Sequence, residues 1–569
     1  MNKTECYNLP EELIDEEIKR LEKERVIERI QQHDHTLWKD DPEEIVNRLG
    51  WLSGHEKMID TLGEIQNLTE EIRQDGYTDA LLLGMGGSSM APEVYRNIFG
   101  VKPGYIYLHV LDSTDPGAIL AIEKTLNFSK TLFIVSTKSG GTVETFSLMK
   151  YFYKRSIEIL GRHSAGEHFI AITDPGSGME KAARELNFRR IFLNDPEIGG
   201  RYSALSYFGL VPAGLIGADL DLLLQNAGIA EKEAMSGDTP INEKNPVWLG
   251  AAAGACAKAG RDKLTFIFPA GLQPFGAWLE QLIAESTGKE GTGILPVDGE
   301  TVASPELYAG DRLFIYYNMA KDKINHPKVQ ALIESGHPVI EFTIKEFYDL
   351  GGEIYRWMLA TAVAGWSMKI NPFDQPNVEA AKVQARSLVA EYSEKGVLPT
   401  VPRDLNVEGI EVFSGFKKKD LHETWQEFLK SLKPGDKDCR GRSYISLQAY
   451  LTPTPATDHA LQALRDKLQE DYRVAVTVGY GPRFLHSTGQ LHKGDAGNGL
   501  FIQLTGKMPE DIAIPENPGS SNSSVTFGVL KSAQALGDRQ ALLDAGRKVI
   551  TFHFKINTEK AIGKLINYL

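Results

Sequence analysis

Five short apolar runs alternate with helical stretches between residues 80 and 193, and this rhythm constrains the fold more than any other feature of the chain. Strands of a parallel sheet read as apolar runs because helices cover both faces of the sheet. The pattern therefore predicts βαβ units that form one doubly wound α/β domain. The runs are Ala80–Leu83, Ile106–Leu111, Leu132–Val135, Phe169–Ile172 and Ile191–Leu193.

A second series of apolar runs predicts a second α/β domain. A predicted helix, Glu353–Ile370, and a polar stretch from about 395 to 442 separate its early strands from its late ones. Residues 1 to about 75 have the pattern of amphipathic helices without strand signals. We therefore expect a helical segment over 1–75, a first domain over 76–240, and a second domain with an insertion and a C-terminal segment over 241–569. The second series consists of Leu264–Phe268, Leu313–Tyr317, Val339–Ile344, Val474–Val478, Phe501–Leu504 and Val549–Phe554.

The composition excludes several classes of function. The 569 residues carry a formal net charge of −14, which opposes a general role in binding nucleic acid or anionic membranes. Cys6, Cys256 and Cys439 are far apart and odd in number, so we expect neither a disulfide framework nor a cysteine zinc site. We also expect no membrane span or signal peptide. A reducing cytoplasm fits these features, and an anionic ligand would need a local pocket.

The segment Ile134–Thr145 indicates such a pocket, because an apolar strand leads through hydroxyl residues and glycines into a helix. The unpaired amides and the dipole at a helix N-terminus favour a phosphate, and Gly140 and Gly141 let the backbone approach it. The same residue types also form ordinary turns and helix caps. Neither familiar glycine-rich nucleotide motif is present, which favours a monophosphate on a small molecule. The candidate hydroxyl donors are Thr137, Ser139 and Thr142.

A second glycine loop, Gly84-Met-Gly-Gly-Ser-Ser89, follows the predicted strand Ala80–Leu83. Ligands of doubly wound sheets bind outside the carboxyl ends of the strands, so both loops could face one pocket. Gly87 and Ser88 are then candidate ligand contacts. The alternative for Ser88 is a plain turn residue.

Three further side chains are candidates for chemistry. Arg201 lies in Gly199-Gly-Arg-Tyr-Ser203, where a guanidinium could stabilise a phosphate or a developing enolate, although a lone arginine is more often a surface residue. Glu285 stands near the predicted end of a helix, where a partly desolvated carboxylate could remove a proton beside a carbonyl. Taken alone, it could equally be a surface acid. Gln281 lies one turn earlier on the same face and could orient a hydroxyl.

The loop His486-Ser-Thr-Gly-Gln-Leu-His-Lys-Gly494 contains two histidines and a lysine. No cysteine pair or His-Glu-x-x-His helix lies nearby, so acid–base or hydrogen-bonding roles outrank zinc binding, and a structural role stays open for either histidine.

Together these motifs resemble the glucose-6-phosphate isomerase family, from about residue 80 to the C-terminus. The form is most similar to the isomerase half of bacterial fusions with transaldolase, including the stretch Asp40–Trp51. The resemblance implies two sugar-isomerase (SIS-type) α/β domains, doubly wound with mainly parallel sheets, and a sugar phosphate bound between them. The motifs are Gly84-Met-Gly-Gly-Ser88, Thr137-Lys-Ser-Gly-Gly-Thr-Val-Glu-Thr145, Gly199-Gly-Arg-Tyr-Ser203, Gln281-x-x-x-Glu-Ser-x-Gly-Lys289 and Ile370-Asn-Pro-Phe-Asp-Gln-Pro376.

The resemblance also implies residue roles. Glu285 would move a proton between carbons 1 and 2 through a cis-enediol, Arg201 would stabilise the negative intermediate, and Gln281 would support the sugar. No cofactor or metal would be needed, because one carboxylate can remove and return the proton. The phosphate would be held by Ser88, Thr137, Ser139 and Thr142, with Gly87 in the same loop as Ser88 and Lys138 nearby.

Ring opening in the family uses a histidine and a C-terminal lysine. His486 matches the histidine through its His-x-x-x-Gln-Leu context, and because that histidine reaches into the partner subunit's site in the family dimer, a homo-oligomer is implied. The family pattern Trp-Gly-Val-Glu-Leu-Gly-Lys is echoed by Phe527-Gly-Val-Leu-Lys531, two residues shorter, and more faintly by Ala561-Ile-Gly-Lys564. We expect Lys531 to be the lysine.

The resemblance thus implies an isomerase of glucose 6-phosphate and fructose 6-phosphate, with a place in glycolysis or gluconeogenesis. One alternative is an isomerase that also accepts mannose 6-phosphate. Another is a noncatalytic phosphosugar sensor, although sensors with these domains normally attach a DNA-binding module and the acidic N-terminus has no helix-turn-helix signal.

Overall fold

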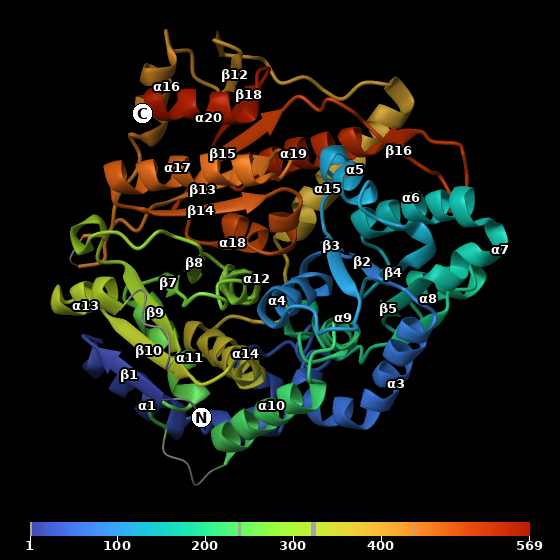
Figure 1. Cartoon of the computed structure of the whole chain (residues 1–569). Helices are drawn as coiled ribbons and strands as arrows, with labels where there is room; N and C mark the ends of the chain where they lie inside the picture. The colour runs from blue at the N-terminus through green and yellow to red at the C-terminus, as the bar shows by residue number, and fades with distance from the viewer. Residues whose placement is uncertain (1–2, 237–240, 320–325, 437) are drawn as a thin grey trace.

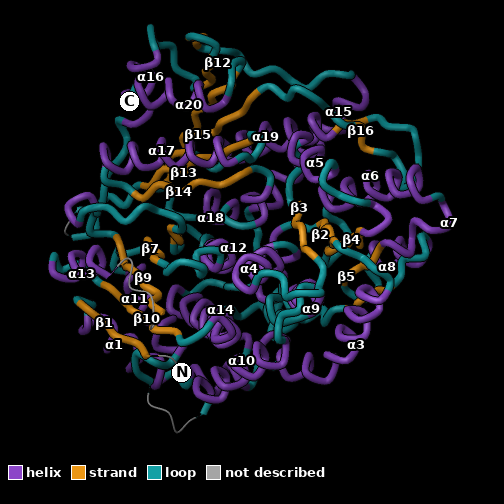
Figure 2. The backbone as a smooth tube through the Cα atoms, viewed as in Figure 1, coloured by secondary structure: helices purple, strands orange, loops and turns teal. Residues whose placement is uncertain are grey.

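Adjacent parallel strands need crossover connections, and in this chain helices form them. The strands assemble into three large, separate sheets (Figure 1). The computed structural model describes residues 3–236, 241–319, 326–436 and 438–569. Within those ranges the strands form two five-stranded sheets, one six-stranded sheet and a two-stranded ribbon. Helices lie between and around the sheets (Figure 2). The predicted α/β class with mainly parallel sheets is confirmed.

The first sheet contains the five strands predicted between residues 80 and 193, and all of its pairings are parallel. Its two faces enter different cores, since Leu82 and Ile134 pack on one side and Leu81 and Phe133 on the other. Both faces are therefore buried, which is why these strands are continuous apolar runs. In spatial order they are β3 (Tyr107–Leu111), β2 (Asp79–Leu83), β4 (Thr131–Ser136), β5 (Phe169–Thr173) and β6 (Arg190–Leu193).

The second sheet has four parallel strands, and β1 adds to its edge in the antiparallel direction. The prediction of a wholly helical segment over residues 1–75 is therefore wrong at its start, although α1 (Glu11–Lys23) and α3 (Gly54–Gln74) agree with it. The sequence Lys-Thr-Glu-Cys-Tyr of β1 is short and partly charged, as an edge strand tolerates. In spatial order the strands are β1 (Lys3–Tyr7), β10 (Val339–Ile344), β9 (Arg312–Met319), β7 (Lys263–Ile267) and β8 (Leu295–Val297).

The last three predicted strands lie in a third sheet and not beside β7, β9 and β10. The expected single domain over 241–569 thus divides between two sheets, and the third has a hydrophobic core of its own on one face. The predicted boundary at 240/241 falls beside residues 237–240, which lie outside the described residues. In spatial order the third sheet contains β11 (Leu405–Val407), β12 (Ile410–Phe413), β18 (Lys548–Phe554), β15 (Gly499–Gly506), β13 (Tyr444–Tyr450) and β14 (Ala475–Tyr480).

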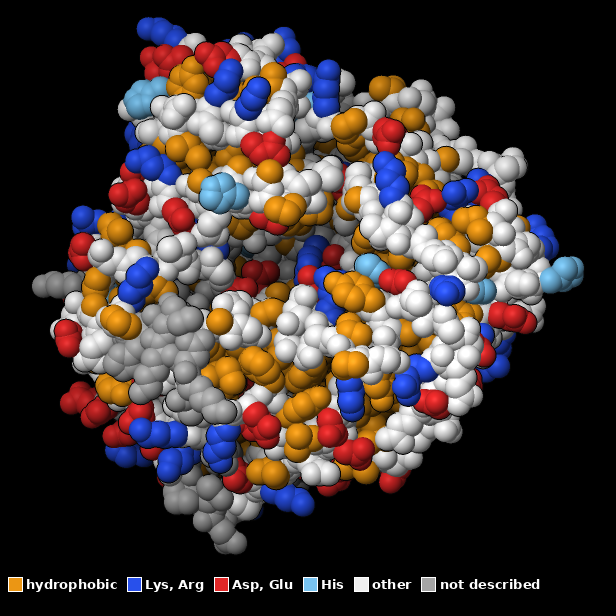
Figure 3. Space-filling model, viewed as in Figure 1, with side chains coloured by type: hydrophobic (Ala, Val, Ile, Leu, Met, Phe, Trp, Pro, Cys, Tyr) orange, Lys and Arg blue, Asp and Glu red, His pale blue; other side chains and the backbone are white. Residues whose placement is uncertain are grey.

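The three sheets approach one another around α12 (Phe275–Thr287). This helix contacts elements attached to each sheet, and Figure 1 shows it near the centre of the molecule. The surface is hollowed in this region, and acidic, basic and histidine side chains gather in the hollow (Figure 3). The partners of α12 are α4 (Met90–Phe99), α14 (Leu350–Met368), which matches the helix predicted over Glu353–Ile370, and α18 (Gly489–Gly494).

Candidate active site

The predicted phosphate loop lies between β4 and α6 (Val143–Leu160), as expected. Ser139 and Thr142 line a cavity of about 340 Å³ beside the N-terminus of this helix. Gly140 has a φ of +67°, and a Cβ there would lie 2.5 Å from the backbone nitrogen of Met179, so the turn requires glycine. The loop therefore offers two hydroxyls and a helix N-terminus to an anion.

Two other residues of this loop face away from the cavity. Nζ of Lys138 lies 2.5 Å from Oδ2 of Asp174 and donates to the carbonyl of Pro196 at 2.9 Å. Thr137 is buried, and its hydroxyl lies 3.4 Å from the hydroxyl of Thr142. Lys138 thus links the loop to Asp174, which follows β5, and the Thr137 hydroxyl contacts that of Thr142.

The second predicted loop follows β2 as the short turn η3 (Gly86–Ser88). A Cβ on Gly87 would lie 2.1 Å from the carbonyl oxygen of Gly200, so only glycine permits this approach of two loops. Ser88 is buried, and its carbonyl accepts a hydrogen bond from Oγ of Ser136 at 3.0 Å. Because β2 and β4 are adjacent and parallel, both loops lie at the same sheet edge. Neither Gly87 nor Ser88 lines the cavity beside Ser139 and Thr142, so their contact with a shared ligand stays a prediction.

Arg201 is buried in the turn η6 (Gly200–Tyr202), with its guanidinium fixed by four hydrogen bonds. Three of the acceptors belong to the signature Ile370–Pro376, which explains why that stretch accompanies the arginine. Nη1 also lies 3.4 Å from Oε1 of Glu285, so the cation and the candidate base are neighbours. The acceptors are Ser286 Oγ (2.7 Å), Gln375 Oε1 (2.9 Å), Pro372 O (2.8 Å) and Asp374 O (2.9 Å).

Glu285 and Gln281 lie one turn apart on α12, as their spacing predicts. The Gln281 amide donates to Oε2 of Glu285 at 3.1 Å, and the same Nε2 donates to the carbonyl of His486 at 2.9 Å. The Glu285 side chain is 13% exposed, so its carboxylate is held between Arg201 and Gln281 with limited access to water. A carboxylate in this position can exchange a proton with a bound substrate.

His486 pairs with Glu144, a residue that we did not single out from the sequence. Nε2 of His486 lies 3.0 Å from Oε1 of Glu144, which also accepts from Nε2 of Gln534 at 2.7 Å. Burial opposes ionisation of Glu144, but His486 and the nearby Lys382 together hold its pKa below the ordinary value. Glu144 orients the imidazole through one ring nitrogen. Glu144 nevertheless belongs to the motif quoted above, in which it is the third residue of Thr142-Val-Glu-Thr145.

His486 reaches this site within a single chain. It ends the turn η9 (Arg483–His486), which follows β14 of the third sheet, and it contacts both α12 and the start of α6 of the same chain. His486 therefore contacts the candidate site of its own chain. A role of this histidine in a partner subunit's site stays a prediction from the resemblance.

Neither lysine expected for ring opening lies in this cavity. Nζ of Lys531 lies 2.5 Å from Oδ2 of Asp115, both side chains are buried, and Lys531 lines a different cavity. Lys564 lies on α20 (Thr558–Asn567) and pairs with Glu408 at the surface. The preference for Lys531 is therefore wrong in geometric terms.

A different lysine, Lys382, lines the cavity of the phosphate loop. It lies on α15 (Val378–Lys395) and lines the cavity together with Ser139, Thr142 and His486. The family pattern Trp-Gly-Val-Glu-Leu-Gly-Lys matches Pro376-Asn-Val-Glu-Ala-Ala-Lys382 at the same spacing, directly after the Asn-Pro-Phe-Asp-Gln motif. The sequence-based prediction missed Lys382 because Phe527-Gly-Val-Leu-Lys531 retains the Gly-Val pair of the family pattern, whereas the segment 376–382 does not.

Lys289 adds a second buried cation behind Glu285. Its Nζ lies 2.6 Å from Oδ1 of Asp374, whose backbone carbonyl accepts hydrogen bonds from both Lys289 and Arg201. Burial and the like charge of Arg201 lower the pKa of Lys289 to about 8, against the attraction of Asp374. The ammonium therefore titrates near neutral pH.

One group of metal-ligand type exists among the described residues, and it stands apart from this cavity. His55, Glu56 and Glu231 bring ligand atoms within 4.8 Å of one another on α3 and α10 (Leu220–Met235). Nε2 of His55 lies 3.1 Å from Oε2 of Glu231, so the buried imidazole has an acidic neighbour of its own.

The chain is similar to proteins of known family. The family model Phosphoglucose isomerase matches residues 55–303, a range that contains Ser88, Arg201 and Glu285. A glucose-6-phosphate isomerase of Thermus thermophilus is 30% identical over 385 residues, which cover 60% of this chain and 90% of the relative. The chain belongs to the glucose-6-phosphate isomerase family.

Other members of the family and solved structures support the assignment. A glucose-6-phosphate isomerase of Rubrobacter xylanophilus is 28% identical over 55% of this chain and 83% of the relative. A hypothetical protein of Thermus thermophilus has a TM-score of 0.59 and 26% identity over 68% of this chain and all of its own. A glucose-6-phosphate isomerase of Chlamydia trachomatis has the same kind of fold, with a TM-score of 0.52, 20% identity, and coverage of 61% of this chain and 75% of that one. No described helix is long and apolar enough to span a membrane.

Replacing Gly87 with alanine should destabilise this member of the family, because the new Cβ would lie 2.1 Å from the Gly200 carbonyl oxygen. We expect a loss of about 1–3 kcal/mol in the free energy of unfolding, measured by chemical denaturation. Gly200→Ala is the matched control, since a Cβ at Gly200 has no heavy atom within 4 Å. Equal stability of the two variants would contradict the close approach of the loops.

Proposed function

We propose that the chain interconverts glucose 6-phosphate and fructose 6-phosphate through a cis-enediol. The observation that carries the proposal is the arrangement of Glu285, whose carboxylate lies 3.4 Å from Nη1 of Arg201 and 3.1 Å from Nε2 of Gln281. A base and a fixed cation lie together, and Gln281 links them to His486, which lines the cavity of the phosphate loop. Membership of the isomerase family supports the same reaction.

The phosphate loop positions the substrate. Ser139 and Thr142 donate hydroxyl hydrogen bonds to the phosphate at the N-terminus of α6, where the helix dipole favours its charge. Ser88 contributes from the adjacent turn. Holding the phosphate fixes the far end of the sugar, so that carbons 1 and 2 lie near the carboxylate of Glu285.

Proton transfer follows from the position of Glu285. In the open-chain aldose, the carboxylate takes the proton from carbon 2, and the electrons of that bond form the carbon 1–carbon 2 double bond as the aldehyde oxygen gains negative charge. Arg201 stabilises this charge in a largely water-excluded site. The hydroxyl proton of carbon 2 passes to the negative oxygen on carbon 1, and Glu285 returns its proton to carbon 1, which gives the ketose. The chain's own side chains suffice for these steps.

Ring opening would use acid–base groups that line the cavity beside the phosphate loop. The Glu144–His486 pair supplies an acid–base group whose imidazole is oriented by the carboxylate, and Lys382 supplies a second group from α15. We assign Lys382, in place of Lys531, as the lysine that acts with His486 on the ring oxygen and the anomeric hydroxyl. Homo-oligomerisation stays a proposal from the family resemblance, and the supply of His486 does not require it.

Glu285→Gln should lower turnover by at least roughly 100-fold, because general acid–base catalysis contributes about 10²–10⁴-fold. Conversion of fructose 6-phosphate, coupled to glucose-6-phosphate dehydrogenase, measures it. Glu290→Gln serves as the control, since the side chain of Glu290 is 52% exposed. Unchanged turnover with lost binding would contradict the role of Glu285, and an inactive wild type that still binds sugar phosphate would favour a sensor.

Lys382→Met should lower kcat by about 10–100-fold, towards the lower part of the range for acid–base groups, because His486 can still act on the ring. Substrate binding should persist, since Ser139 and Thr142 remain. Lys564→Met, on the surface helix α20, should behave as wild type in the same assay. A Lys382→Met variant with wild-type kcat would remove this assignment.

The rate should also fall as the pH rises through about 8, the pKa to which burial and Arg201 lower Lys289. The ammonium is charged below that pH and neutral above it. Loss of the charge weakens the contact of Lys289 with Asp374, whose backbone carbonyl also accepts a hydrogen bond from Arg201. In Lys289→Arg the guanidinium stays charged, so the alkaline fall in kcat/KM should move to higher pH. Lys57→Arg, at an exposed ion pair, is the matched control. An identical alkaline limb in wild type and Lys289→Arg would exclude Lys289 as its origin.

A further inference from the structure

A second cavity, of about 540 Å³, lies at the edge of the third sheet where its parallel strands end. Tyr450 of β13 and Thr505 of β15 line it at the carboxyl ends of these strands. The connections reverse direction between the two strands, because β14 lies beyond β13 while β18 lies beyond β15. Ligands of open α/β sheets bind at such a reversal, and small-molecule sites typically have volumes of about 300–1,000 Å³.

The two faces of the third sheet differ in polarity around this cavity. Val412, Leu504 and Phe552 point into the hydrophobic core. Their sequence neighbours on the opposite face are polar and form a row across three strands, in which Oγ1 of Thr505 lies 2.9 Å from Nδ1 of His553. Gln503 and Thr551 of this row are buried and the other members are partly buried, and polar groups in such positions need hydrogen-bonding partners, so the face suits a polar ligand. The row consists of Glu411, Gln503, Thr505, Thr551 and His553.

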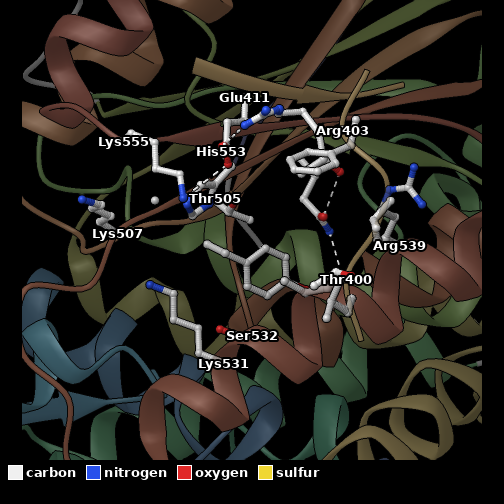
Figure 4. A pocket seen from close by; sticks show the side chains of 18 of the residues that line it. Thr400, Arg403, Glu411, Thr505, Lys507, Lys531, Ser532, Arg539, His553 and Lys555 are labelled. Carbon is white, nitrogen blue, oxygen red and sulfur yellow. Dashed lines mark hydrogen bonds and ion pairs between the residues drawn. The ribbon is translucent and has the colours of Figure 1, made fainter. Parts of the chain in front are cut away.

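Cationic side chains outnumber carboxylates in the lining of this cavity. In Figure 4 the side-chain ends of Lys507, Lys531 and Lys555 lie on one side, whereas Arg539 lies on the other. Lys507 follows the end of β15, Lys555 follows the end of β18, and Lys531 lies on α19. Glu411 is the one carboxylate in the lining that the described residues form. This local excess of positive charge contrasts with the net charge of −14 of the whole chain. The five cations are Arg403, Lys507, Lys531, Arg539 and Lys555.

Two of these cations have no ion-pair partner within 4.0 Å among the described residues. Glu411 pairs with both Arg403, at 2.7 Å, and Lys555, at 3.3 Å, and Asp115 pairs with Lys531. Lys507 and Arg539 remain, on opposite sides of the cavity.

The half-buried position of Arg539 makes its lack of a partner notable. Its Nε atom is buried and has no hydrogen-bond partner in the described part of the chain. A buried donor of a charged group without an acceptor is costly, and an anionic ligand would supply the acceptor.

Helix α19 (Phe527–Asp544) separates this cavity from the candidate active site. Lys531 and Ser532 line the third-sheet cavity, whereas Leu530 and Gln534 line the cavity of the phosphate loop. None of the residues assigned above to catalysis lines the third-sheet cavity. A ligand bound there would therefore occupy a site of its own.

We propose that the third-sheet cavity binds a small molecule with two anionic groups, at least one of them a phosphate monoester. The phosphate lies among Lys507, Lys531 and Lys555, where several charge-assisted hydrogen bonds converge. The second anionic group meets Arg539 across the cavity. The carbon body between them lies over apolar lining such as Phe413 and Leu536. The proposal does not depend on the isomerase reaction.

Isothermal titration calorimetry with fructose 1,6-bisphosphate as the probe tests this site. Wild type and a Ser139→Ala/Thr142→Val variant of the active-site loop should both bind the probe in the third-sheet cavity. Lys507→Ala/Arg539→Ala should weaken that binding at least about tenfold, since a hydrogen bond to a charged group contributes about 1.5–3 kcal/mol. Lys507→Arg/Arg539→Lys keeps both charges and should retain most of the affinity. Thermal unfolding confirms that each variant folds.

Three outcomes would overturn the proposal. The first is equal affinity of wild type and Lys507→Ala/Arg539→Ala for the probe. The second is loss of all binding in the loop variant alone, which would assign the probe to the active site. The third is no binding by wild type at millimolar probe. Failure of the isomerase proposal would instead appear as absent turnover, while the calorimetry would still report on this cavity.

Discussion

The side-chain amide of Gln281 is the contact on which the candidate active site depends. One nitrogen donates both to the carboxylate of Glu285 and to the carbonyl of His486, so it joins α12 to a turn of the third sheet. Gln281 is buried, and hydrogen bonds away from water are electrostatically stronger. The amide therefore sets the relative position of the base and the histidine. The third sheet must dock in one orientation for both to face the same substrate.

Docking of the third sheet also positions Lys382, because α15 lies along α19 of that part of the chain (Figure 1). A Cβ on Gly537 of α19 would lie 2.9 Å from the backbone nitrogen of Ala385, so the two helices approach closely where glycine allows it. His486 and Lys382 thus depend on one body of structure, whereas Glu285 and Arg201 depend on the first two sheets. A single chain thus brings His486 and Lys382 to the same cavity.

The sequence predicted the strands that are buried on both faces, and it missed strands whose position depends on contacts with distant parts of the chain. Continuous apolar runs revealed the first sheet, because both faces of its strands are buried. The edge strand Lys3–Tyr7 and the strand Tyr444–Tyr450 carry weaker patterns, and nothing local indicated that the late strands form a separate sheet. Motif spacing singled out Arg201, Gln281 and Glu285, and the structure brings these three side chains together. It failed for the lysine, because spacing alone could not tell which face of α19 Lys531 occupies.

Helix α19 links the two cavities by a row of polar contacts as well as by a shared wall. Lys531, on the third-sheet side, pairs with Asp115, which caps α5 (Pro116–Glu123). The preceding Thr114 donates to Gln534 at 2.8 Å, and Gln534 donates at 2.7 Å to the carboxylate of Glu144, which pairs with His486. An anion bound beside Lys531 would compete with Asp115 for the same ammonium. Gln534 lies one helical turn from Lys531 on α19, so the polar contacts of the two cavities meet on one helix.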